Sequence, residues 1–90
     1  MRSIRYTSQF KKDVKRAKKR GKDMGKLKEV IELLVGGEEL DSRYRDHALI
    51  GNYRGARDCH LEPDWLLIYE VNEEELILIR TGTHSDLFGR

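Results

Sequence analysis

The sequence is poor in the residues and segments that would indicate a disulfide, a cysteine-rich zinc site or a membrane anchor. Cys59 is the single cysteine, which excludes an intramolecular disulfide and any zinc site built on cysteine pairs. No apolar run approaches the roughly 20 residues that a membrane-spanning helix requires, and no apolar secretory segment follows Met1. Repeats and low-complexity tracts are also missing. We therefore expect a cytoplasmic protein that makes no membrane contact.

Length and composition allow one small domain. A chain of 90 residues buries about two-thirds of its unfolded surface, which is enough for one sheet covered by one or two helices. Because 38% of the residues are charged, the core must be compact, and the apolar runs 30–35, 65–71 and 76–79 supply most of it. No linker interrupts the chain. Residues 1–90 are therefore predicted to form a single domain.

Positive charge is concentrated in the first third of the chain. Residues 1–28 hold twelve Lys and Arg against two Asp, a balance of +10, whereas residues 29–90 hold six basic and fourteen acidic residues, a balance of −8. Basic density of this kind binds nucleic acid, because each neutralised phosphate releases bound counterions. The alternative is a solvated helix face that binds nothing.

Apolar spacing predicts a short first strand followed by two helices. Residues 2–6 alternate in polarity, as a strand does. Apolar residues then recur at helical spacing over 10–17 and over 24–34, and Thr7-Ser8 and Asp23 supply the two N-caps. The helices are predicted to form an antiparallel hairpin with one apolar seam.

The rest of the chain is predicted to be mostly β. Segments 56–61, 65–71 and 76–83 are strands joined by two short turns, which require antiparallel pairing. The continuous apolar stretch 65–69 marks the central strand, and 47–50 is a short strand or an edge segment. The order βααβββ indicates an α+β fold, an antiparallel sheet with the two-helix hairpin packed on one face.

Three histidines carry the candidate chemistry, and all lie in the β half, at strand ends or in loops. His47 follows Asp46, His84 follows the last predicted strand, and His60 shares a strand face with Asp58 because side chains alternate. An imidazole beside a carboxylate suits proton transfer near neutral pH. A surface or structural role is nevertheless the simpler explanation of any one histidine alone.

Three chemistries compete for this set. The histidines could bind zinc together with Asp58 and Asp64, but no HxH or HExxH spacing preorganises such a site. Cys59 could act as a nucleophile, yet it points to the strand face opposite His60 and is expected to be packed. The third chemistry is metal-free cleavage of RNA. A base removes the 2′-hydroxyl proton, an imidazolium protonates the departing 5′-oxygen, and cations hold the phosphate.

Two arginines lie on strands beside these histidines. Arg57 and Arg80 could each hold a phosphate through two parallel hydrogen bonds. Either could equally pair with a carboxylate of this acidic half. The sequence alone leaves both possibilities open.

Five motifs together resemble the YafQ branch of the RelE toxin superfamily. They are KDVKR at 12–16, KDM at 22–24, DHxL at 46–49, RDxHxEPDWxLIY at 57–69 and RTGTHxxLF at 80–88. The resemblance covers nearly the whole chain, and its last three motifs are highly specific in combination. It implies a RelE-like microbial RNase fold and a toxin that enters the ribosomal A site and cleaves the mRNA codon there. The products would carry a 2′,3′-cyclic phosphate or 3′-phosphate and a 5′-hydroxyl.

The resemblance also implies roles for particular residues. His84 would be the general acid, and His60, oriented by Asp58 or Asp64, or else His47, would be the base. Arg80 would neutralise the scissile phosphate, with Arg57 as a further RNA contact. The implied active-site set is His47, Asp58, His60, Asp64, His84 and Phe88, where Phe88 would hold the mRNA or merely seal the core. The implied contacts with ribosomal RNA are Lys11, Lys12, Lys15, Lys18 and Lys19.

The implied scheme uses no metal ion or cofactor. The superfamily's archetype relies on Arg, Lys and Tyr, so its acid and base assignments do not transfer to this histidine set. Asp86 would either favour a protonated His84 or cap a turn. The implied partners are the ribosome, mRNA and a cognate antitoxin whose acidic helical segment covers the positive cleft. A non-catalytic ribosome- or RNA-binding module of the same fold is the alternative.

Overall fold

The computed structural model describes residues 1–89, in which the predicted order of elements is present together with two short 3-10 turns and a third helix. The elements are β1 (Ser3–Tyr6), α1 (Ser8–Lys19), α2 (Met24–Val35), β2 (His47–Ala48), β3 (Arg57–Glu62), β4 (Trp65–Val71), β5 (Glu75–Gly82) and α3 (His84–Phe88). Two short 3-10 turns, η1 (Ser42–Tyr44) and η2 (Gly51–Tyr53), flank β2. Within these residues none of the helices combines the length and apolar character needed to cross a membrane.

The helical hairpin begins and ends where the sequence predicts. The Thr7 hydroxyl accepts a hydrogen bond from Phe10 N at 3.0 Å and caps α1, while Asp23 Oδ1 accepts from Gly25 N at 2.9 Å and caps α2. Gly21, with φ +78°, takes the left-handed conformation that lets the chain leave α1 and turn into α2.

The five strands form one sheet in the order β1-β5-β4-β3-β2, with β4 in the centre as predicted. The pairs β3–β4 and β4–β5 are antiparallel, as their short turns require. One pairing differs from the prediction: β1 runs parallel to β5, so the sheet is mixed. Short loops dictate the direction of consecutive strands only. Between β1 and β5 the chain passes through the helical hairpin and the other three strands, so no short loop sets their relative direction.

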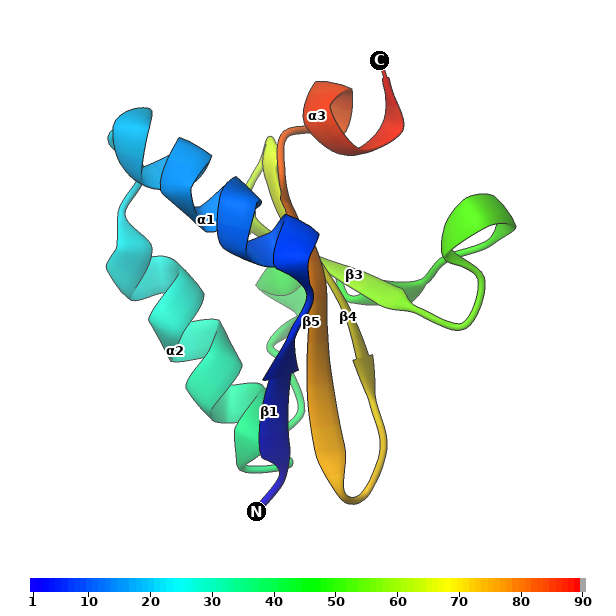
Figure 1. Ribbon diagram of the computed structural model, residues 1–90. Coiled ribbons are helices and arrows are strands. Elements are labelled where there is room, and N and C mark those ends of the chain that lie inside the picture. The colour runs from blue at the N-terminus through cyan, green and yellow to red at the C-terminus, as the bar shows by residue number, and fades with distance from the viewer. Residues whose placement is uncertain (90) are drawn as a thin grey trace.

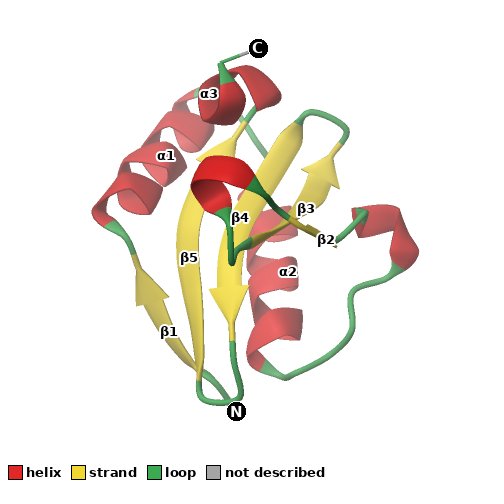
Figure 2. Ribbon diagram, turned by 90° about the vertical axis from the view of Figure 1, so that its right-hand side faces the viewer, coloured by secondary structure: helices red, strands yellow, loops and turns green. Residues whose placement is uncertain are grey.

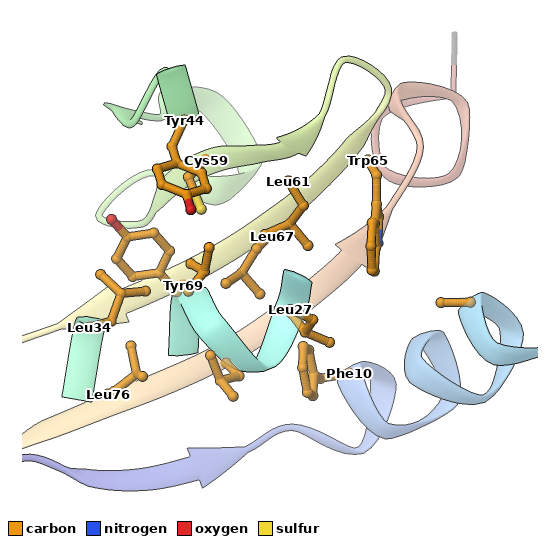
Figure 3. Packing of buried hydrophobic residues seen from close by; sticks show 13 residues of the cluster. Phe10, Leu27, Leu34, Tyr44, Cys59, Leu61, Trp65, Leu67, Tyr69 and Leu76 are labelled. Carbon is orange, nitrogen blue, oxygen red and sulfur yellow. The ribbon is translucent and has the colours of Figure 1, made fainter. Parts of the chain in front are cut away.

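The two faces of the sheet are covered differently. Helices α1 and α2 cover one face (Figure 1), where the larger core packs around residues such as Leu27, Trp65 and Leu67. Cys59 lies in this core beside Tyr44 (Figure 3). The other face carries a small apolar cluster and is only partly covered by η2 and α3 (Figure 2).

Helix α3 was not foreseen from the sequence, which predicted a strand up to residue 83. The Thr83 hydroxyl caps the helix by accepting from Asp86 N at 3.0 Å, and Asp86 Oδ2 accepts from Thr83 N at 2.9 Å. The Asp86 carboxylate also accepts hydrogen bonds from both terminal nitrogens of Arg20, at 2.6 and 3.2 Å. Of the two predicted roles for Asp86, the structure therefore shows the cap, extended by a bridge to α1.

Candidate active site

The three histidines converge on the less covered face although they come from three different elements. His47 begins β2, His60 lies within β3, and His84 is the first residue of α3. The ring centroids of His47 and His60 are 6.5 Å apart, and those of His60 and His84 are 5.6 Å apart. Antiparallel pairing sets His47 directly opposite Asp58. The cluster thus combines three imidazoles with a carboxylate beneath them.

Asp58 is the buried carboxylate of this cluster, with 2% of its surface exposed. Its Oδ1 lies 3.0 Å from Nδ1 of His47, which also approaches the carbonyl oxygen of Arg45 at 2.9 Å. No well-aligned hydrogen bond reaches Asp58 Oδ1 from the part of the chain that the structure describes. Burial raises the pKa of Asp58, and the three nearby histidines oppose this rise.

His60 sits between the other two rings and is only partly exposed. Burial lowers the pKa of His60 below the ordinary value of 6.5, while the negative charge of Asp58 acts in the opposite direction. The imidazole is therefore mostly neutral at pH 7. A neutral ring can accept a proton, which a base must do.

His84 is oriented by Asp64 from the turn between β3 and β4. Asp64 Oδ1 accepts hydrogen bonds from the backbone N of His84 at 2.8 Å and from its ring Nδ1 at 2.5 Å. These hydrogen bonds hold the pKa of Asp64 below its ordinary value. The ionised carboxylate keeps a proton on Nδ1, which leaves Nε2 as the nitrogen available to a substrate.

A cleft of about 540 Å³ opens beside these groups. His47, Asp58, His60 and His84 line its polar side, and its apolar side is formed by Leu49, Ile50, Tyr53, Leu87 and Phe88. Phe88 remains 38% exposed and packs edge-on against Tyr53, with ring centroids 5.9 Å apart. Both rings are therefore accessible to a planar group such as a nucleobase. Tyr53 is not predicted from the sequence, because a single tyrosine in a glycine-framed turn carries no recognisable motif.

Arg80 lies next to Tyr53 at the edge of the cleft and is paired with a carboxylate. Its Nε and Nη2 donate to Asp13 of α1 at 2.8 and 3.1 Å, and its Nη1 lies 3.5 Å from the Tyr53 hydroxyl. Asp13 belongs to the KDVKR motif, yet its role as the partner of Arg80 could not be read from the sequence. One edge of the guanidinium is therefore fixed, and Nη1 is directed toward a residue of the cleft.

Arg57 is paired with a carboxylate on the sheet face opposite His60. Its Nε donates to Asp46 Oδ1 at 2.9 Å, and Asp46 Oδ2 accepts from the hydroxyl of the buried Tyr69 at 2.7 Å. The reason is the alternation of the strand, which sends Arg57 to the helix-covered face with Tyr69 and Cys59. The carboxylate-pairing alternative left open by the sequence is the one that the structure contains.

Cys59 is fully buried, and burial raises the pKa of its thiol, so nucleophilic chemistry at this residue is not supported. Among residues 1–89 no three His, Cys, Asp or Glu side chains are arranged to hold a metal ion. The five lysines of α1 are all exposed. The basic surface therefore exists as expected, on the helix that also binds α3 through Arg20.

Comparison with known proteins agrees with the resemblance carried by the motifs. The model of a family described as "Bacterial toxin of type II toxin-antitoxin system, YafQ" matches residues 2–89. The mRNA interferase toxin YafQ of Escherichia coli K12 is 51% identical over 89 residues, covering 98% of this chain and 97% of that protein.

Solved structures share the fold over nearly the whole chain. In the crystal structure of the E. coli DinJ–YafQ toxin–antitoxin complex, a chain is 50% identical with a TM-score of 0.91, and 98% of each chain is covered. A copper-bound mutant toxin from Helicobacter pylori is 42% identical with a TM-score of 0.92, covering 98% of this chain and 100% of that chain. The predicted family and α+β fold class are thereby confirmed. The chain belongs to the YafQ family of bacterial toxins of type II toxin–antitoxin systems.

Proposed function

We propose that this protein is a ribosome-dependent endoribonuclease that cleaves mRNA in the A site and thereby stops translation. The observation that carries the proposal is the convergence of His47, His60 and His84 around the buried Asp58 at one cleft. Relatives covering nearly the whole chain are named mRNA interferases, which supports RNA as the substrate. The exposed lysines of α1 supply a surface for ribosomal RNA.

His84 is proposed as the general acid and His60 as the base. The lowered pKa of His60 favours the neutral ring that removes a proton from the 2′-hydroxyl. The 2′-oxygen then attacks phosphorus, the bond from phosphorus to the 5′-oxygen breaks, and Nε2 of His84 protonates that oxygen. The products are a 2′,3′-cyclic phosphate and a 5′-hydroxyl. Asp64 is hydrogen-bonded to His84, so its proposed role is to orient the general acid.

His47 remains the alternative base. Its Nδ1 is held between Asp58 and the Arg45 carbonyl, so its Nε2 is the nitrogen that can face substrate. The two candidates differ in a measurable way. Replacing the true base removes the rise in rate with pH on the acidic side of the pH–rate profile, because that rise reports deprotonation of the base. Replacing the other histidine lowers the rate without changing the shape of that profile.

Arg80 and Phe88 are proposed to bind the RNA strand. Arg80 directs Nη1 toward Tyr53 while Asp13 holds its other edge, which gives a preoriented positive charge for the scissile phosphate. Phe88 and Tyr53 offer ring surfaces for an unstacked base. Lys11, Lys12, Lys15, Lys18 and Lys19 are proposed to contact ribosomal RNA.

An antitoxin is proposed to restrain the enzyme by laying an acidic helical segment over the cleft and its basic surroundings. The E. coli relative is found in a complex with DinJ, which supports a protein partner of this kind. Affinity capture of the tagged protein from its native host should recover one small acidic protein in stoichiometric amount. Recovery of no such protein contradicts this part of the proposal.

The decisive experiment compares His84→Ala with Ser85→Ala, an exposed neighbour on the same helix turn. Each protein is added to translating ribosomes, and 5′-hydroxyl mRNA ends are mapped. Loss of a general acid slows cleavage by roughly 10²- to 10⁴-fold, whereas the serine variant should cleave at the wild-type rate. Unchanged cleavage by His84→Ala refutes the assignment.

The same assay separates the competing functions. A non-catalytic binding module would bind ribosomes with a steep salt dependence but would create no new 5′-hydroxyl ends. A metal-dependent nuclease is tested as well, because the Helicobacter relative binds copper. Such an enzyme would lose activity when a chelator selective for transition metals is added. Ample magnesium keeps the ribosomes intact in that control. Retained cleavage supports proton transfer by the side chains alone.

A further inference from the structure

A second groove adjoins the cleft and has no role in the scheme above. It has a volume of about 420 Å³ and lies between α2, η1 and the turn joining β3 to β4. His60 lines both the groove and the cleft, so the two hollows meet at this residue.

Three cations and the carboxylates of Glu29 and Glu62 line the groove, and two of the cations are engaged. Lys26 Nζ is 2.9 Å from Glu62 Oε2. The Arg43 guanidinium lies over the ring of Tyr44, 4.8 Å from its centroid, and donates to the Tyr44 hydroxyl at 2.9 Å. Arg45 is exposed, and within residues 1–89 its side chain has no ion pair or hydrogen bond. Its charge nevertheless acts on the His60 imidazole, whose pKa it helps to lower.

The backbone of Arg45 has an unusual conformation. Arg45 has φ 49° and ψ 42°, and it is the single residue other than glycine with a positive φ in the described part of the chain. This left-handed conformation is unfavourable for arginine and ordinary for glycine or asparagine. Strained residues of this kind persist where the surroundings hold them, and they are enriched at functional sites.

The surroundings do hold this turn. Tyr44 is buried in the core, and Asp41 Oδ1 accepts from Arg43 N at 2.9 Å to cap η1. Arg45 N donates to the Ser42 carbonyl at 3.1 Å. The Arg45 carbonyl in turn lies 2.9 Å from Nδ1 of His47. The turn is thus tied on one side to the core and on the other to the histidine cluster.

We propose that Arg45 binds a phosphate of the RNA strand next to the scissile phosphate, and that the groove continues the RNA path beyond His60. This inference rests on the proposed action on RNA. Arg57 is paired with Asp46 on the other face, and Arg80 is paired with Asp13, so Arg45 is the arginine beside His60 whose donors are all free. A guanidinium binds a phosphate through two parallel hydrogen bonds.

The test separates the charge of Arg45 from its backbone conformation. Arg45→Asn removes the charge but tolerates the left-handed backbone, so it should fold with equal or higher stability than the wild type. Arg45→Lys keeps one positive charge. Arg5→Asn, on the far sheet edge in β1, removes an exposed arginine outside both hollows and serves as the matched control.

Binding is measured by fluorescence anisotropy with a short oligoribonucleotide that carries 2′-deoxy substitutions and so cannot be cleaved. Arg45→Asn should bind about tenfold more weakly than wild type, as expected for one lost charged contact. The slope of log affinity against log salt should fall by about 0.7, the value for one phosphate of a single strand. Arg45→Lys should keep the wild-type slope, and Arg5→Asn should stay within about twofold in affinity.

The outcomes are distinguishable from those for the nuclease. Unchanged affinity and slope in Arg45→Asn, or no RNA binding by the wild type, refutes the phosphate site. Weakened antitoxin binding with unchanged RNA binding also refutes it, because the groove would then serve the protein partner. If Arg45 affects binding while ribosome-bound mRNA is not cleaved, the phosphate site stands and the proposed nuclease activity falls.

Discussion

Replacing Asp13 should destabilise the protein more than any other change to its charged residues. Asp13 is 1% exposed and ties α1 to the edge of β5. Its carboxylate accepts from Arg80 Nε and Nη2 at 2.8 and 3.1 Å, and from the backbone N of Thr81 at 3.1 Å. Arg16 and Gln9 add hydrogen bonds at 3.0 and 3.2 Å. Removal of the carboxylate therefore leaves several donors without an acceptor.

The magnitude follows from what is left behind in Asp13→Ala. The buried Thr81 N–H loses its partner, which costs roughly 1–3 kcal/mol. The Arg80 side chain, 19% exposed, loses its counter-charge, and breaking such a pair costs roughly 3–5 kcal/mol where both groups are buried. Because Arg80 can turn partly toward solvent, we expect a total loss of about 3–4 kcal/mol in the free energy of unfolding. For a domain of this size that corresponds to a fall of at least about 12 °C in Tm.

Urea denaturation followed by circular dichroism measures the loss directly. Gln9→Ala, which removes one exposed donor to the same carboxylate, should cost less than about 1 kcal/mol and is the matched control. A loss below about 1 kcal/mol in Asp13→Ala would show that Arg80 and Thr81 find other partners, and the reasoning would fail. Asp13→Asn, which keeps the volume and one acceptor, should fall between the two.

Three further predictions concern the cleft and its support. Asp58→Asn should raise the free energy of unfolding at pH 7, because burial raises the pKa of Asp58 and its ionised form is unfavourable in the folded protein. This gain should disappear as the pH falls toward 4 and the carboxyl becomes protonated. Equal effects at both pH values in urea titrations contradict the prediction. Asp86→Asn weakens the cap of α3 and its bridge to Arg20, so it should lower the free energy of unfolding by on the order of 1 kcal/mol. It should also lower kcat and speed amide hydrogen exchange at His84, and unchanged exchange refutes a positioning role. Cys59→Ala should retain full cleavage, and native Cys59 should resist alkylation by iodoacetamide, whereas rapid labelling would show that the thiol is accessible.

Much of the architecture followed from local chemistry. The capping residues Thr7 and Asp23 and the apolar periodicity between them placed the hairpin, because these signals act within one helical turn. The turns at 62–64 and 72–75 were too short for anything but antiparallel strands. Alternation along β3 correctly separated Cys59 from His60. The motifs at 46–49, 57–69 and 80–88 identified the family, which the comparisons confirm.

Other features depended on contacts between residues that are far apart in the chain. The parallel pairing of β1 with β5 joins the two ends of the sequence. Helix α3 is five residues long, and it is stabilised by its capping box and by Arg20 from α1 rather than by helical periodicity. The acidic partners of Arg57 and Arg80 were equally invisible, since an arginine pairs with whichever carboxylate the fold brings near it.

The sequence by itself therefore determined the family, the α+β class and the identity of the histidines, because periodicity, capping and motif are properties of neighbouring residues. Only the tertiary structure decided how the site is assembled. It set His47, His60 and His84 around Asp58 and committed Arg80 to Asp13. Within residues 1–89 it left the side chain of Arg45 unpaired beside His60. The physical reason is that burial and charge pairing depend on distance in space, and the sheet brings together segments that are remote along the chain.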